Sequence, residues 1–257
     1  MLTNKYAFAS VLALLLGAGA VSADEGGHTT WQRKADNEVA NLPSLQRGAR
    51  NFMNYCSGCH SLKYIRYSRV AEDLKIPDDL RDAFLVKPGA KFSDYIKSSM
   101  PPADAQDWFG KVPPDLSLVA RSRGSDWVFN FLTTFYADPA SRQTGVNNLQ
   151  FPGTAMPHVL ASLQGVQSLA PNAAEHEAAE SGEAEHRAAK VFEPGVAGSL
   201  SPEKYDEFVR DTVNFLQYVS DPTQLERQGL GLWVVLFLLM FTGIAYLLKK
   251  EYWKDVT

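Results

Sequence analysis

Cys56, Cys59 and His60 bring three potential ligands into five consecutive positions of a 257-residue chain. The sequence has no other cysteine, and His60 is one of five histidines. All three residues lie in the stretch NFMNYCSGCHSL. A thioredoxin-like redox pair would use the two thiols and give the histidine no role. A zinc site would need a second pair of ligands, and the sequence has no further cysteine. The spacing instead matches Cys-x-x-Cys-His, the attachment pattern of c-type haem.

The adjacency of the three side chains suits haem attachment. Two thiols can bond to the two vinyl groups on one edge of a porphyrin, and the next residue then carries its imidazole beneath the ring to the iron. We therefore predict one covalently bound haem c per chain. A disulfide and a metal site are the alternatives to this interpretation.

An iron that carries electrons needs a sixth ligand, because an open position would bind small molecules. A methionine thioether favours a high potential, since it stabilises ferrous iron. Three methionines are unsuitable because they lie at the start of the chain, beside the motif on its own helix, or in a long apolar run: Met1, Met53 and Met240. Met156, in the stiff turn FPGTAMPHVL, is favoured over Met100, and His158 is a rival ligand.

Two apolar runs predict how the chain is placed in the cell. Residues 1–23 have the basic start, apolar run and small-residue end of a signal peptide. The run 230–248 has no charged residue and would span roughly 28 Å as a transmembrane helix. Lysines dominate the tail 249–257, which predicts a cytoplasmic C-terminus. Residues 24–226 then form a periplasmic haem domain.

The spacing of apolar residues makes this domain mainly α-helical, with long loops. Prolines punctuate residues 61–114, where strands are expected to be scarce. Ser201 and Pro202 have the residue types of a helix N-cap and first helical position. The predicted helices are 43–55, 116–120, 126–136 and 202–218.

The chain is mildly acidic, with a formal net charge of −4. This charge argues against nucleic acid as a partner. Residues 171–193 are rich in alanine and glutamate and lack an apolar pattern. We interpret them as a solvated, acidic insert.

Six stretches of the chain, in matching order and spacing, resemble cytochrome c1 of the proteobacterial type, the membrane-anchored haem subunit of the cytochrome bc1 complex (ubiquinol:cytochrome c oxidoreductase). The run PPDLS followed by the loop FPG…MP is the most specific part. Trp127 stands where some members of the family have tyrosine, and His158 where others have a second proline. The stretches are LQRGARNFMNYCSGCHSLKY, KPGAKFSDYIKSSMPP, VPPDLSLVARSRG, DWVFNFL, FPGTAMPHVL and the C-terminal anchor.

The resemblance implies a c-type cytochrome fold and roles for individual residues. Cys56 and Cys59 would carry the thioethers, while His60 and Met156 would be the two iron ligands. Arg121 would lie near a haem propionate, where a guanidinium offsets carboxylate charge. Without the resemblance, Arg121 would be interpreted as an exposed basic residue.

The resemblance also implies partners. The chain would take one electron from a Rieske iron-sulfur protein and pass it to a soluble cytochrome c. Cytochrome b would anchor the dimeric complex in the lipid of the bacterial inner membrane. As an electron-transfer subunit of an oxidoreductase, the chain is expected to perform no substrate chemistry of its own.

Two other functions remain open from the sequence. One is a different membrane-anchored cytochrome c that feeds a terminal oxidase directly. The other is a haem enzyme or gas sensor, which would need a labile sixth ligand.

Overall fold

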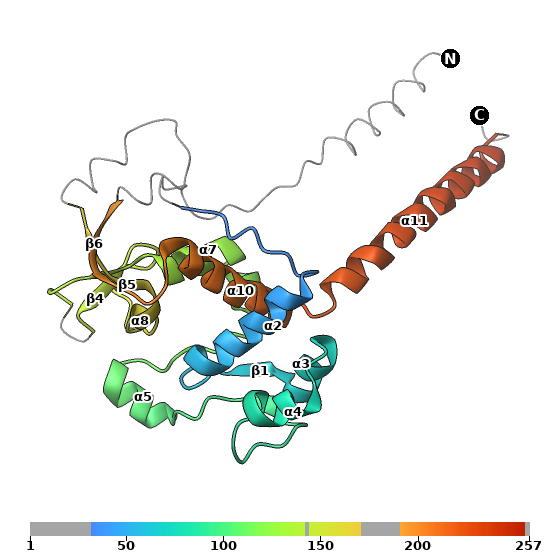
Figure 1. Cartoon of the computed structure of the whole chain (residues 1–257). Coiled ribbons are helices and arrows are strands. Elements are labelled where there is room, and N and C mark those ends of the chain that lie inside the picture. Colours follow the sequence, from blue (N-terminus) through green and yellow to red (C-terminus); the bar gives the residue numbers. More distant parts are fainter. Residues whose placement is uncertain (1–31, 142–143, 171–190, 255–257) are drawn as a thin grey trace. The chain divides into compact units, whose positions relative to one another are not determined.

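The computed structural model describes residues 32–141, 144–170 and 191–254, and within them the chain is mainly helical (Figure 1). The predicted signal peptide lies outside these residues. The helices are α2 (Leu42–Asn51), η1 (Phe52–Cys56), α3 (Tyr67–Asp73), α4 (Asp78–Leu80), η2 (Arg81–Leu85), α5 (Pro102–Phe109), α6 (Val119–Ser122), α7 (Ser125–Thr133), α8 (Ala161–Gln164), α10 (Pro202–Ser220) and α11 (Gln224–Tyr252). The strands are β1 (Leu62–Arg66), β2 (Tyr95–Ile96), β3 (Phe135–Ala137), β4 (Val146–Asn148), β5 (Gly165–Leu169) and β6 (Phe192–Ala197).

Helices α2 and α10 pack closely against each other in the hydrophobic core (Figure 1). Gly48 permits this approach, because a Cβ atom there would lie 2.1 Å from the backbone oxygen of Asp211 and 2.7 Å from the Cβ of Phe215. The buried Asp211 carboxylate accepts hydrogen bonds from Ser44 Oγ at 2.7 Å and Arg47 Nε at 2.6 Å. A buried carboxylate is tolerated only when it is paired in this way.

Helix α10 begins as the sequence predicted. Ser201 is the N-cap and accepts a hydrogen bond from the backbone N–H of Lys204 at 3.4 Å, and Pro202 begins the helix. One face of the helix packs into the core. Phe208 on this face is half-buried, and the other members are buried: Val209, Thr212, Phe215, Leu216 and Val219.

The predicted helix 43–55 is present but changes from an α-helix to a π-helix as it approaches the haem motif. Residues 42–51 form α2, with the Asn41 side chain capping its first turn, and Phe52–Cys56 continue as the π-helix η1. The N–H of Ser57 bonds to the carbonyl of Phe52 at 2.9 Å, five residues back. Such wider turns occur frequently at functional sites.

Two predicted helices differ in extent. The expected helix 116–120 is instead α6, which begins at Val119, because residues 113–116 have no regular secondary structure and 117–118 form a turn. The expected helix 126–136 ends at Thr133. The hydroxyls of Thr133 and Thr134 bond back to helical carbonyls, and Phe135–Ala137 then pair with β4 as a strand.

The strands form three two-stranded antiparallel sheets within the described residues. Only β1 and β2 fall between residues 61 and 114, so strands are scarce there, as predicted. β5 and β6 flank residues 171–190, which lie outside the described residues. Only the last three residues of the predicted insert 171–193 are described. Val191 is buried, its carbonyl accepts a hydrogen bond from the N–H of Ala170 at 2.9 Å, and residues 192 and 193 belong to β6.

The segment before α2 ties α7 to α10. The backbone N–H of Arg33 donates to Asn130 Oδ1 at 2.9 Å, and that of Ala35 donates to Asp126 Oδ1 at 2.7 Å, both on α7. Arg210, on α10, donates from Nε to the carbonyl of Ala35 at 2.8 Å. These bonds connect both helices to residues 33–35, which have no regular secondary structure.

Helix α11 contains the predicted span 230–248 and is longer, with 29 residues. Its mean hydropathy is 2.3 over the most apolar window, none of which is buried. Its length and composition are those of a helix that crosses a membrane, and Lys249 and Lys250 lie in its last turn.

Gly48→Ala should lower the free energy of unfolding by about 3 kcal/mol, because the added methyl group must push α2 away from α10. Chemical denaturation of the purified protein measures this loss. Gly229→Ala is the matched control, since a Cβ at this helical glycine meets nothing within 4 Å. A Gly48→Ala protein as stable as the control would show that α2 and α10 do not need this close contact.

Candidate haem site

Cys56 is the last residue of η1, and Cys59 lies in the tight turn that follows it. The N–H groups of Cys59 and His60 both donate to the carbonyl of Cys56, at 3.1 and 2.9 Å. Both thiols are half-buried and free of a disulfide. Burial, with a smaller contribution from Cys59, raises the pKa of the Cys56 thiol to about 12. A thioredoxin-like pair needs a lowered pKa, so the site does not have the electrostatics of a thiol redox centre.

His60 is held by one hydrogen bond that defines its chemistry. Its side chain is buried, and Nδ1 lies 2.7 Å from the carbonyl oxygen of Pro114. A carbonyl only accepts, so Nδ1 carries the proton and Nε2 has a free lone pair. Burial lowers the pKa of His60 and so favours the neutral ring. The hydrogen bond to Pro114 raises the pKa and offsets part of this effect. Nε2 makes no hydrogen bond within the described residues, as suits a metal ligand.

The stretch PPDLS runs beside the motif and supports it, a role that the sequence did not reveal. Leu116 N donates to the carbonyl of Ser61 at 2.9 Å, next to His60. The carboxylate of Asp115 accepts from the backbone N–H of Lys63 at 2.8 Å and from that of Ser117 at 3.0 Å. A proline favours extended backbone at the residue before it, so the two consecutive prolines were the only available signal for this arrangement.

The loop that carries Met156 is shaped by polar contacts. Asn147 Oδ1 accepts from the N–H of Gly153 at 2.8 Å, and Asn148 Oδ1 accepts from that of Phe151 at 3.0 Å. Gly153 has φ of 73°, a left-handed conformation that glycine adopts without strain. Met156 packs, half-buried, against the same hydrophobic core as Cys56.

An aromatic series joins the two ends of this loop. The His158 ring stacks on that of Phe135 with 4.9 Å between the ring centroids, and Phe135 packs edge to face on Phe131 with 5.2 Å between centroids. Phe131 stacks on Trp127 with a centroid distance of 5.3 Å, and Trp127 packs against Phe151 with one of 6.3 Å. Phe151 and His158 lie on either side of Met156 in the sequence. The loop is therefore fixed on both sides to α7 and β3.

The two rival ligands are placed differently from Met156. Met100 is half-buried, but it does not belong to the group of half-buried residues that pack on the core. Burial lowers the pKa of His158 to about 4, partly offset by the Gly165 backbone and the Gln164 side chain. No hydrogen bond of good geometry reaches its Nε2 within the described residues. Its ring is nevertheless held flat against Phe135.

Arg121 is exposed at the end of α6. Its guanidinium makes no ion pair within the part of the chain that the structure describes. It follows the PPDLS stretch by four residues, so its backbone is carried by the same segment that holds His60. The guanidinium is thus available to an anion near that segment.

The residues present fit a covalent c-type haem. Two thiols that form no disulfide adjoin an imidazole whose Nε2 is free, and Met156 borders the same core. Among the described residues, no group of three or more His, Cys, Asp or Glu side chains could hold a metal ion. The motif is suited to a porphyrin, which the two thiols and the imidazole can bind at separate points. It belongs to a helical domain with a membrane helix. These features define a membrane-anchored c-type cytochrome.

Residues 31–179 and 199–256 match the model of the Cytochrome C1 family. The chain is 48% identical to the cytochrome c1 of Allochromatium vinosum, over 95% of this chain and 96% of that protein. It is 40% identical to the ammonia monooxygenase gamma subunit of Nitrosomonas europaea, over 96% and 97% of the two chains. It is 28% identical to the cytochrome b/c1 of Bradyrhizobium diazoefficiens, over 97% of this chain and 40% of that protein.

The chain belongs to the cytochrome c1 family. Its cofactor is the covalently bound haem c of that family, and its process is respiratory electron transport, as predicted. The predicted mainly α fold with a C-terminal membrane helix is also confirmed.

Asp115→Ala should lower the free energy of unfolding by about 2 kcal/mol, because two backbone N–H groups lose a charged acceptor. Thermal and denaturant unfolding of the haem-loaded protein measure the loss. Asp107→Ala provides the control, since Asp107 is exposed and makes no hydrogen bond within the described residues. Equal stability of the two variants would contradict the supporting role of the PPDLS stretch.

Proposed function

We propose that this chain is the electron-carrying haem subunit of a bc1-type complex. It takes one electron from a Rieske iron-sulfur protein and passes it to a soluble cytochrome c. The observation that carries this proposal is the hydrogen bond from His60 Nδ1 to the Pro114 carbonyl, directly beside two free thiols. This bond leaves Nε2 available and orients the ring, which is what a permanent proximal ligand requires.

Cys56 and Cys59 attach the haem through thioether bonds, and His60 is its proximal ligand. The bound haem supplies one-electron chemistry through its iron. The protein's part is to keep the His60 ring neutral, fixed and sheltered from water. Pro114, Asp115 and the η1 helix perform this task, so little rearrangement accompanies a change of charge.

Met156 is the proposed distal ligand. Three observations support it over Met100: its contact with the core that Cys56 also borders, its anchored loop and its flanking aromatic series. His158 is the weaker candidate because its ring is stacked on Phe135. A thioether ligand raises the potential relative to a second imidazole.

Arg121 is the proposed partner of a haem propionate. Its exposure and the lack of an ion pair within the described residues leave the guanidinium available for a carboxylate. Its segment is hydrogen-bonded to the residues that follow His60, which supports this role. A guanidinium there would offset the propionate charge.

Helix α11 is the proposed inner-membrane anchor, with residues 24–226 periplasmic and the tail cytoplasmic. The lysines at its end support this orientation. The Bradyrhizobium relative is named cytochrome b/c1, and this name supports cytochrome b as the partner here. An anchor beside the electron donor raises the effective concentration of the two centres.

Purification of the full chain from its native membranes tests the proposed assembly. We expect a two-haem cytochrome b and an iron-sulfur protein to co-purify, and the ferrous haem to resist carbon monoxide at neutral pH. Co-purification with a terminal oxidase or a monooxygenase, without cytochrome b, would contradict the proposal. Ready binding of carbon monoxide would instead indicate a labile sixth ligand, as in a haem enzyme or gas sensor.

Met156→Leu should lower the reduction potential of the haem, because the thioether that stabilises ferrous iron is lost. Redox titration of the purified variant measures the change. Met100→Leu is the matched control and should keep the potential of the unaltered protein. If the Met100 variant shifts and the Met156 variant does not, the distal ligand is assigned to the wrong loop.

A further inference from the structure

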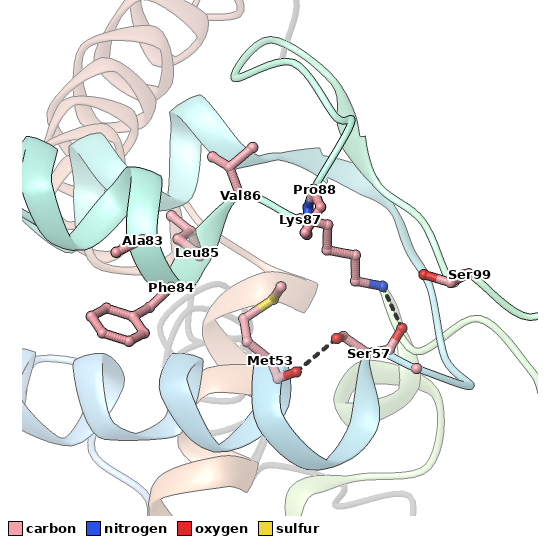
Figure 2. Close-up of a pocket in the computed structure, with 10 residues that line it drawn as sticks. Met53, Ser57, Ala83, Phe84, Leu85, Val86, Lys87, Pro88 and Ser99 are labelled. Atoms are coloured by element: carbon pink, nitrogen blue, oxygen red, sulfur yellow. Dashed lines mark hydrogen bonds between the residues drawn. The ribbon is translucent and has the colours of Figure 1, made fainter.

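A pocket of about 460 Å³ opens beside the haem motif (Figure 2). It is lined by residues 83–88, from η2 and the loop after it, and by Ser57 and Gly58, the two residues between the cysteines. Neither cysteine of the motif lines it, nor do the proposed iron ligands. The pocket is therefore a neighbour of the haem site rather than the site itself.

The side chain of Lys87 crosses this pocket to the motif, as Figure 2 shows. Its Nζ donates to the backbone carbonyl of Ser57 at 2.5 Å and to that of Lys97 at 2.9 Å. Ser57 directly follows Cys56 in the chain. The ammonium group is thus bound to the turn that attaches the haem, at a fixed position.

No carboxylate neutralises this ammonium within the described residues. Its two acceptors are neutral carbonyl groups, whose dipoles stabilise a cation but do not cancel its charge. Burial lowers the pKa of Lys87, as expected for a half-buried amine that is partly removed from water. In such surroundings a charge acts over a longer range than it does at an exposed position.

We propose that Lys87 is a positioning residue whose fixed positive charge raises the reduction potential of the haem held by Cys56 and Cys59. Ferric haem carries one more positive charge than ferrous haem, so a nearby cation disfavours the oxidised state. The inference rests on the proposed function, since it requires the haem at this motif.

Ser98 makes a similar contact without a charge. Its Oγ donates to the carbonyl of Gly58 at 2.6 Å, one residue beyond the carbonyl that Lys87 contacts. Ser98→Ala therefore removes a hydrogen bond from the same turn and leaves the charge unchanged. This variant separates the mechanical support of the turn from the electrostatic effect of Lys87.

The test is a redox titration of the purified, haem-loaded full chain carrying Lys87→Met, Lys87→Gln or Lys87→Arg. We expect the Met and Gln variants to shift the equilibrium with a reference couple about tenfold toward the oxidised haem, which is 59 mV for one electron. Lys87→Arg should retain the original potential because it keeps the charge. Lys97→Met should also retain it, because the side chain of Lys97 is exposed and its charge is screened by water.

Unchanged potentials in both neutral variants would overturn the inference. So would a shift in Ser98→Ala as large as that in Lys87→Met, because support of the turn would then be the cause. Failure of both neutral variants to retain haem would likewise assign Lys87 a purely structural role. Failure of the proposed function looks different, since the unaltered protein would then lack covalent haem or its cytochrome b partner.

Discussion

The close contact of α2 and α10 at Gly48 determines where the haem motif lies. The backbone oxygen of Asp211 occupies the space that any side chain at residue 48 would need. The carboxylate of the same residue binds Ser44 and Arg47 from α2. Packing and polar pairing therefore fix one face of α2. Because η1 continues α2 without a break, the position of Cys56 follows from that of the helix.

The motif is then supported from two further directions. On one side, Pro114 and Asp115 hold His60 and the strand that follows it. On the other, Lys87 and Ser98 bind the carbonyls of the two residues between the cysteines. Electron transfer benefits from such rigidity, since a ligand set that does not rearrange loses little energy when the charge changes. The site thus depends on segments distant in sequence that converge on five residues.

Local signals made part of this arrangement predictable from the sequence. The Cys-x-x-Cys-His spacing indicates haem attachment, Ser201 and Pro202 indicate a helix start, and a run of nineteen uncharged residues indicates a membrane helix. Each of these signals depends on neighbours in the chain. For the same reason, the helical content was predicted well, and the boundaries were predicted less well.

The remaining features depend on contacts between distant segments. The helix predicted from residue 116 begins at Val119, and the Asp115 carboxylate just before it accepts a hydrogen bond from the backbone N–H of Lys63, more than fifty residues away. The helix predicted to reach residue 136 stops early because Phe135 pairs with Asn148 in a strand. Lys87 gave no signal at all, since an isolated lysine is usually exposed. Only the packed structure shows that its amine reaches the motif.

The central claim is that His60 and Met156, nearly a hundred residues apart, bind the same iron. X-ray absorption at the iron edge of the purified protein measures this directly, because sulfur and nitrogen ligands differ in distance and scattering. The account predicts one sulfur ligand in the unaltered protein and in Met100→Leu, and none in Met156→Leu. A sulfur ligand that persists in Met156→Leu, or an unaltered protein with nitrogen ligands alone, would contradict it.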